Sequence, residues 1–116
     1  GNYFYYKKMI IDNLGNMFRG WFIGNFEPSI YKTDNFEVAI LFHPKGEKWP
    51  KHYHKEAIEI NVLISGKMII NGKSLTSGDI FLIEKNEIAE PEFLEDCTIV
   101  CVKTPSMPGD KYEVEE

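Results

Sequence analysis

The chain has 116 residues and is 43% hydrophobic and 14% aromatic, which is enough apolar material for one folded domain with one core. Its formal net charge of −5 argues against a general nucleic-acid binder, because such proteins need a basic face to contact phosphates. No apolar run approaches the ~20 residues that a membrane-spanning helix needs, so we expect neither a nucleic-acid nor a membrane partner.

Short apolar runs, separated by glycine, asparagine, aspartate and proline, follow one another along the whole chain. No segment has the sustained spacing of three and four apolar residues that marks an amphipathic helix. The pattern predicts an all-β protein with little or no helix, either a sandwich or a barrel of short strands. Before residue 44 we expect strands over residues 3–11, 17–23 and 36–43, a turn over residues 12–16 and a loop at residues 27–29.

The C-terminal half follows the same pattern. Asn71-Gly72 predicts a type I′ hairpin, because both central positions of that turn need a positive φ. Nothing marks an internal repeat or a linker between two cores, so we expect a single domain over residues 1–116. The strands expected after the central segment cover residues 58–65, 68–70, 80–83 and 97–102.

Two histidines lie one residue apart at His52 and His54. If this segment is extended, both imidazoles point to the same face, since side chains on a strand alternate with period 2. Glu59 has the opposite parity and would face the other way on one straight strand. A turn near residues 55–57 would place Glu59 on a neighbouring strand, where it can face the two histidines. Two imidazoles and a carboxylate on one face are a donor set that suits a metal ion.

Five positions of this segment follow one spacing: a glycine, five residues, His-x-His, four residues, a glutamate, six residues and a glycine. They are filled by Gly46, His52, His54, Glu59 and Gly66. This arrangement resembles the first motif of the cupin superfamily. The resemblance implies a cupin-type double-stranded β-helix, a jelly-roll barrel. Residues 1–35 would then form N-terminal strands, residues 36–102 the barrel core and residues 103–116 an irregular C-terminal tail.

The second motif of that family is a glycine, five residues, Pro-x-Gly, two residues and a histidine. Gly78-Asp79 begins it well. Asparagine then replaces the glycine, and it tolerates the same left-handed backbone. Alanine replaces the histidine, the family's fourth metal ligand, and it cannot coordinate a metal. A small register shift would let Glu90 or Glu92 take its place. The replaced positions are Glu84 at the proline, Asn86 at the glycine and Ala89 at the histidine.

The resemblance leaves two interpretations of the site open. In the first, His52, His54 and Glu59 bind a divalent ion (iron, manganese, nickel or zinc), and the protein is an enzyme acting on a small anionic metabolite. Family analogy allows oxygenase, isomerase or epimerase, and lyase chemistry. In the second, the metal site is degenerate, and the protein is a non-catalytic module that binds a small molecule or a sugar.

Two further alternatives need no metal. His52 or His54 would be the general base of a metal-free sugar epimerase, although the sequence shows no clear acid partner for it. Otherwise the two histidines and Glu59 form a satisfied polar cluster inside a β-barrel, because buried polar groups need hydrogen-bond partners.

Lysines crowd the approach to the histidines at Lys45, Lys48, Lys51 and Lys55. In an acidic protein this is a local positive rim, which would attract an anionic ligand. The alternative is a solvated loop without a binding role. We take Lys51 as the candidate ligand-binding lysine.

Other candidate ligand-binding residues are Trp49, Tyr53 and Asn61. Trp49 would be a platform for a ring, or it would pack at the barrel rim. Tyr53 flanks the same loop, and Asn61 has the parity of Glu59 on the expected strand. His43 ends a strand before a proline, where it either enters the site or lies in a surface turn.

A strand that turns Glu59 inward places Ile58, Ile60, Val62 and Ile64 on its outer face. Four aliphatic side chains in water form a patch that monomers rarely expose. The N-terminal strands are one candidate cover, and a second copy of the chain is the other. We expect a homodimer.

Cys97 and Cys101 are the two cysteines of the chain. On one strand they would lie ~13 Å apart at ~3.3 Å per residue, whereas a disulfide needs Cα atoms within ~7 Å. We expect reduced core thiols in a cytoplasmic protein.

Overall fold

The computed structural model describes residues 8–115. Within them the chain forms strands and one short 3-10 helix, which confirms the expected all-β class. No helix among these residues is long and apolar enough to cross a bilayer. In chain order the elements are η1 (Leu14–Asn16), β1 (Trp21–Gly24), β2 (Tyr31–Lys32), β3 (Glu37–His43), β4 (His52–Tyr53), β5 (Ile58–Ser65), β6 (Met68–Ile70), β7 (Lys73–Leu75), β8 (Ile80–Ile83), β9 (Pro91–Phe93), β10 (Cys97–Thr104) and β11 (Tyr112–Glu113).

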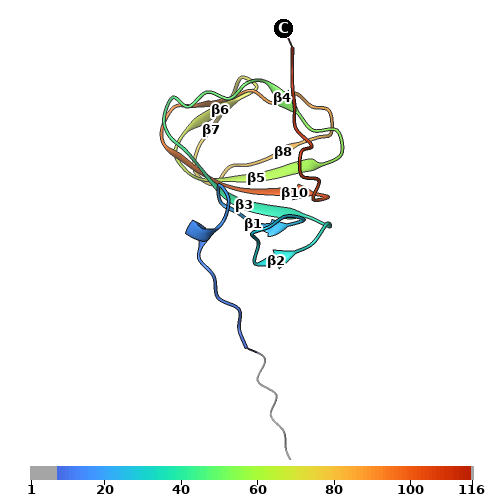
Figure 1. The fold of residues 1–116 in the computed structure, drawn as a ribbon. Helices are drawn as coiled ribbons and strands as arrows, with labels where there is room; N and C mark the ends of the chain where they lie inside the picture. The colour runs from blue at the N-terminus through green and yellow to red at the C-terminus, as the bar shows by residue number, and fades with distance from the viewer. Residues whose placement is uncertain (1–7, 116) are drawn as a thin grey trace, which may run out of the picture.

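The strands form two walls that face each other across the barrel (Figure 1). One wall is a six-stranded sheet in the order β2-β1-β3-β10-β5-β8. The other wall combines a three-stranded sheet, β7-β6-β9, with a two-stranded sheet, β11-β4. Apart from the short parallel β1–β2 pair, these pairings are antiparallel. An antiparallel sheet can carry different chemistry on its two faces, and here the inner faces line the barrel.

Odd-numbered residues of β3, β5 and β10 point into the barrel, and for β5 this is the orientation that an inward Glu59 predicted. Both β3 and β5 pair with β10 in a register that aligns odd with odd positions, so the inward side chains stand in rows across the sheet. Polarity changes from row to row along the strands. The rows are Glu37–Lys103–Glu59, then Ala39–Cys101–Asn61, then Leu41–Ile99–Leu63.

Beyond the charged row, the barrel is filled by a core of apolar side chains. Cys97 and Cys101 are free and buried on the inner face of β10, as expected. Burial raises the pKa of both thiols, so they are protonated at neutral pH. The core consists of Leu63, Met68, Ile70, Ile83, Ala89, Phe93, Cys97 and Ile99.

The N-terminal segment differs from the expectation. Of the strand expected over residues 3–11, residues 3–7 lie outside the described residues, and residues 8–11 form no strand. Their exposed side chains have no sheet to pair with. β1 starts at Trp21 instead of residue 17, because Arg19 and Gly20 adopt positive φ values of 51° and 85° and turn the chain.

Two of the predicted turn positions have the expected backbone. Asn71 and Gly72 have φ values of 50° and 77°, and they connect β6 to β7 as a type I′ turn requires. Asn86, at the glycine position of the second motif, has a φ of 64°. Asparagine therefore serves there in place of glycine.

The C-terminal segment is more ordered than the predicted irregular tail. β10 continues to Thr104, and β11 pairs with β4, which carries His52. The Asp110 carboxylate accepts the backbone N–H groups of residues 55, 56 and 57 at 2.9–3.0 Å. These N–H groups belong to the turn after the histidines and have no strand partner, so the tail supplies the acceptor that they need. Local pattern could not show this because the two segments are far apart in sequence.

Candidate functional site

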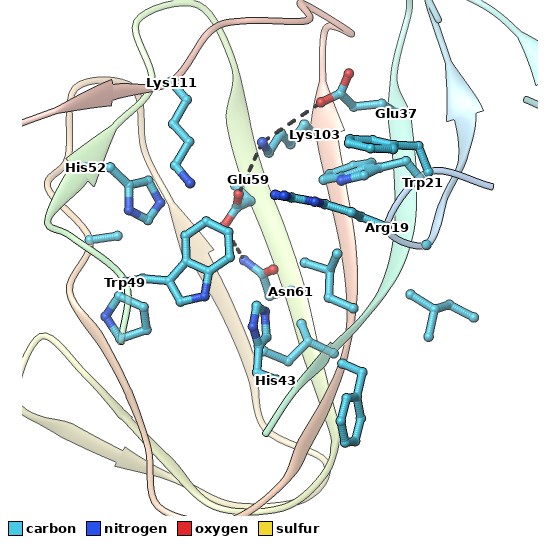
Figure 2. Close-up of a pocket in the computed structure, with 18 of the residues that line it drawn as sticks. Arg19, Trp21, Glu37, His43, Trp49, His52, Glu59, Asn61, Lys103 and Lys111 are labelled. Carbon is cyan, nitrogen blue, oxygen red and sulfur yellow. Dashed lines mark hydrogen bonds and ion pairs between the residues drawn. The ribbon is translucent and has the colours of Figure 1, made fainter. Parts of the chain in front are cut away.

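The barrel interior is part of a hollow of about 1110 Å³, which is lined by both walls and by the turn that precedes β1 and which also extends over outward-facing residues such as Phe42. This exceeds the ~300–1,000 Å³ of usual ligand pockets, so there is room for a metabolite-sized molecule. The lining combines aromatic rings, imidazoles, carboxylates and ammonium groups (Figure 2).

His52 on β4 and His54 directly after it both line the cavity, and their exposed fractions are 9% and 2%. The ring centroids lie 5.5 Å apart, with the planes at 85°. Nδ1 of His52 lies 3.0 Å from the carbonyl oxygen of Pro50 and donates to it, which leaves the lone pair of Nε2 free in the neutral ring. Nε2 of His54 is buried and has no hydrogen-bond partner among the described residues.

Both imidazoles are neutral at neutral pH. Burial lowers the pKa of His52. Burial, together with the nearby charge of Lys103, lowers the pKa of His54 to about 4. Each ring can therefore offer a lone pair to a proton donor or to a metal ion.

The Glu59 carboxylate is held by partners other than the histidines. Asn61 Nδ2 donates to it at 3.1 Å, and Lys103 Nζ lies 3.9 Å from its Oε1. Lys103 Nζ is also 3.9 Å from Glu37 Oε1, and Ser106 Oγ donates to the other oxygen of Glu37 at 2.8 Å. We call this chain of five side chains, Asn61, Glu59, Lys103, Glu37 and Ser106, the Lys103 network; Figure 2 shows the first four.

The predicted three-ligand metal site is not assembled in this arrangement. Within residues 8–115, no three His, Cys, Asp or Glu side chains are grouped to hold a metal ion. The two imidazoles offer free nitrogens, but Glu59 is bound into the Lys103 network. Ala89, at the fourth ligand position, lies opposite His52 and pairs with it through two backbone hydrogen bonds of 3.2 and 2.8 Å. The donor set as it stands does not fit a metal held by three protein ligands.

Glu90 and Glu92, the predicted replacement ligands, do not line the cavity. Both side chains are exposed, and Glu90 lies 3.8 Å from Lys51 on the outside of the barrel. The parity of this segment is the reason: Ala89, Pro91 and Phe93 line the cavity, and the even positions between them face outward.

Of the four residues expected to bind the ligand, Trp49 and Asn61 line the cavity. Tyr53 and Lys51 do not. Tyr53 alternates with the two inward histidines and stacks on Tyr112 at a centroid distance of 5.5 Å. Lys51 has the same outward parity and pairs with Glu90.

His43 enters the site from β3 instead of lying in a surface turn. Its exposed fraction is 8%, its ring stacks on Phe93 at 4.3 Å, and its Nδ1 lies 3.0 Å from Glu47 Oε2. The odd positions of β3 face inward, which decides between the two alternatives that the sequence left open.

Three cations that sequence reasoning did not single out reach the cavity: Arg19, Lys103 and Lys111. In Figure 2 all three point toward the space beside Glu59. The ammonium of Lys111 lies 3.7 Å from the ring centroid of Trp49, and that of Lys103 lies 5.0 Å from the ring centroid of Trp21. Burial and the charge of Lys103 lower the pKa of Lys111.

A signal for one of these cations was present in the sequence. Lys103 has the same parity as Cys97 and Cys101, so the expected strand, extended by one residue, places it on the inner face. Lys111 gives no such signal, because it reaches the cavity through the pairing of the tail with β4.

No protein-family model matches the chain, and no curated protein matches it. Solved structures do match. The DMSP lyase DddQ from Ruegeria pomeroyi superimposes with a TM-score of 0.67 at 16% identity. The match covers 81% of this chain but only about half (49%) of the DddQ chain. An uncharacterized protein with a double-stranded β-helix domain from Klebsiella pneumoniae has a TM-score of 0.65 at 17% identity, over 94% of this chain and 100% of that one. KdgF from a Halomonas species has a TM-score of 0.58 at 18% identity, over 66% and 74% of the two chains.

These likenesses, together with the two-walled barrel, define a double-stranded β-helix protein. The fold is the double-stranded β-helix that the resemblance of residues 46–66 to the first cupin motif implied. Enzymes and a protein of unknown activity share this fold, so function has to be argued from the cavity itself.

Proposed function

We propose that this protein binds a small anionic molecule, such as a carboxylate or a sugar phosphate, in the barrel cavity. Lys111 and Arg19 would contact the anionic group, and Trp49 would pack against the rest of the molecule. The histidine pair would receive hydrogen bonds from the ligand through its free ring nitrogens. The observation that carries the proposal is that Lys111 and Arg19 reach the cavity without an ion pair among the described residues, whereas Lys103 is already paired with Glu37 and Glu59.

Lys111 contributes most to this argument. Its ammonium makes no ion pair among the described residues, and it lies against the face of Trp49. The lowered pKa shows that its surroundings disfavour the positive charge. An anion in the cavity would offset that unfavourable energy, and the low local dielectric would strengthen the attraction.

The test is calorimetric titration with a panel of carboxylates and sugar phosphates and their uncharged analogues. We expect an anion to bind and its uncharged analogue to bind at least about tenfold more weakly, which is ~1.4 kcal/mol. Lys111→Met should weaken binding of the anion by a similar factor. Lys73→Met, at an exposed lysine of β7 outside the cavity, is the matched control and should leave the affinity unchanged. Equal binding of charged and uncharged ligands would contradict the proposal.

A metal-dependent reaction on such a molecule is the second candidate function. It is favoured by one observation, the buried Nε2 of His54 that has no partner among the described residues, beside the free Nε2 of His52. Elemental analysis of protein purified without an affinity tag tests it. Near-stoichiometric iron, manganese, nickel or zinc that disappears in His52→Ala would support it, and protein without metal after reconstitution would contradict it.

We also propose that the chain forms a homodimer through the outer face of the six-stranded sheet. Phe42 and Ile80 are 64% and 70% exposed there, and Ile64 and Leu82 are 48% and 47% exposed. The described N-terminal strands β1 and β2 extend this sheet at its β3 edge, so they do not cover β5 and β8. An apolar face of this kind marks an interaction surface. In a symmetric dimer, the apolar face of one copy would pack against the same face of the other.

A further inference from the structure

An ammonium group already neutralises the carboxylate that the metal motif requires. Lys103 lies between Glu37 and Glu59 on adjacent strands, with its Nζ 3.9 Å from an oxygen of each. The three side chains are largely buried, with exposed fractions of 17%, 8% and 14%. Two carboxylates and one ammonium therefore form a compact charged group inside the barrel.

The position of Lys103 follows from the strand register. Lys103 is the direct cross-strand neighbour of both glutamates, so no loop movement is needed to bring the three together. Each carboxylate also accepts a second hydrogen bond, from Ser106 in one case and from Asn61 in the other. The ring of Trp21 lies 5.0 Å from the Lys103 ammonium (Figure 2). These contacts hold Glu59 in its present orientation.

A divalent ion beside the histidines would compete with this arrangement. Glu59 would have to leave Lys103 and Asn61 to become a metal ligand. The ion would also repel the ammonium groups of Lys103 and Lys111, and charges on largely buried side chains interact more strongly than charges in water. One carboxylate cannot serve both cations at full strength.

We propose that Lys103 is the resident cation of this site and the residue that excludes divalent metal ions from His52, His54 and Glu59. Lys103 thereby makes the cavity a metal-independent one, whatever ligand it binds. Removal of the Lys103 charge releases Glu59 and converts the three residues into a metal site. This inference goes beyond the proposed anion binding and does not depend on it.

The experiment is a titration of metal-free protein with Co²⁺ alone, followed by calorimetry and by the visible absorption that Co²⁺ acquires when imidazole and carboxylate bind it. Only Co²⁺ binding that is lost in His54→Ala is counted as binding at this site, and its affinity is the quantity compared between variants. Lys103→Met should bind Co²⁺ at least about tenfold more tightly than the wild type. Lys103→Arg keeps the positive charge and should behave like the wild type.

Two double variants make the test specific. Lys103→Met with Glu59→Gln should lose the gained affinity, because the released carboxylate is gone. Lys103→Met with Glu37→Gln removes one positive and one negative charge, so it keeps the charge balance of the cavity and serves if Lys103→Met alone does not fold. It should bind Co²⁺ as tightly as Lys103→Met.

Two outcomes would overturn the inference. One is tight Co²⁺ binding by the wild type that Glu59→Gln weakens, since Lys103 would then not exclude the ion. The other is no gain in a folded Lys103→Met or in the double variant with Glu37→Gln. Neither outcome involves an anionic ligand, so failure of the anion titration and failure of this inference are distinguishable.

Discussion

The two faces of the six-stranded sheet differ in a way that reverses the usual pattern. A sheet with one face on a core normally has apolar residues inside and polar residues outside. Here the inner face begins with the charged row Glu37–Lys103–Glu59, while the outer face exposes Phe42 and Ile80. This difference is the basis of both proposals: an inner face that binds a ligand at this end of the barrel, and an outer face that a second copy covers.

The largest expected effect concerns the inner face. Lys103→Met leaves two largely buried carboxylates without their shared cation, so we expect the free energy of unfolding to fall by about 3–5 kcal/mol. Urea denaturation measures it. Adding Glu37→Gln should recover part of the loss, and Lys48→Met, at an exposed site, should change stability by less than about 0.5 kcal/mol. A small effect of Lys103→Met on the free energy of unfolding would mean that the charged row Glu37–Lys103–Glu59 does not stabilise the fold.

The next effect is on the dependence of stability on pH, and it arises from His54 on the facing wall. Its pKa is about 4 in the folded protein, against ~6.5 in an unfolded chain, so the unfolded state binds more protons between these values. Stability should therefore be lost as the pH falls from ~6.5 to ~4, by up to about 3 kcal/mol. His54→Gln should flatten this part of the curve in urea denaturation at several pH values. An unchanged slope would contradict the assignment.

The third effect concerns the outer face and is a change in association. Phe42→Asp places a charge on the proposed dimer surface and should weaken self-association at least about tenfold. Light scattering at micromolar concentration measures the mass of each variant. Leu94→Asp is the matched control, because Leu94 is 40% exposed but lies outside the six-stranded sheet. A monomeric wild type at that concentration would contradict the dimer.

Much of the fold could be predicted because strand alternation is a local property. The parity of residues 58–65, with Glu59 turned inward, correctly separated the inner from the outer face of that strand. The spacing from Gly46 to Gly66 indicated the barrel, and Asn71-Gly72 indicated a turn whose φ values are as expected. The strand expected over residues 3–11 failed within residues 8–11, because alternation without a pairing partner does not make a strand.

The site could be predicted in part. His52, His54, Glu59 and Asn61 do line one cavity, since their parity relative to their strands was visible in the sequence. Glu90 and Glu92 were misplaced by one position, and a one-residue slip sends a side chain to the other face. The partner of Glu59 could not be predicted at all, because the motif names a ligand set and says nothing of the strand beside it.

The sequence by itself determined the class of fold, the turns with left-handed backbone and the inward direction of the histidine pair. These follow from period-2 alternation and from the steric limits on φ, both of which act within a few residues. Only the tertiary structure decided that Lys103 lies between Glu37 and Glu59, that Lys111 enters the cavity, and that Asp110 holds the turn after His54. Each of these depends on the register between strands distant in the chain, where charges meet only after the barrel has closed.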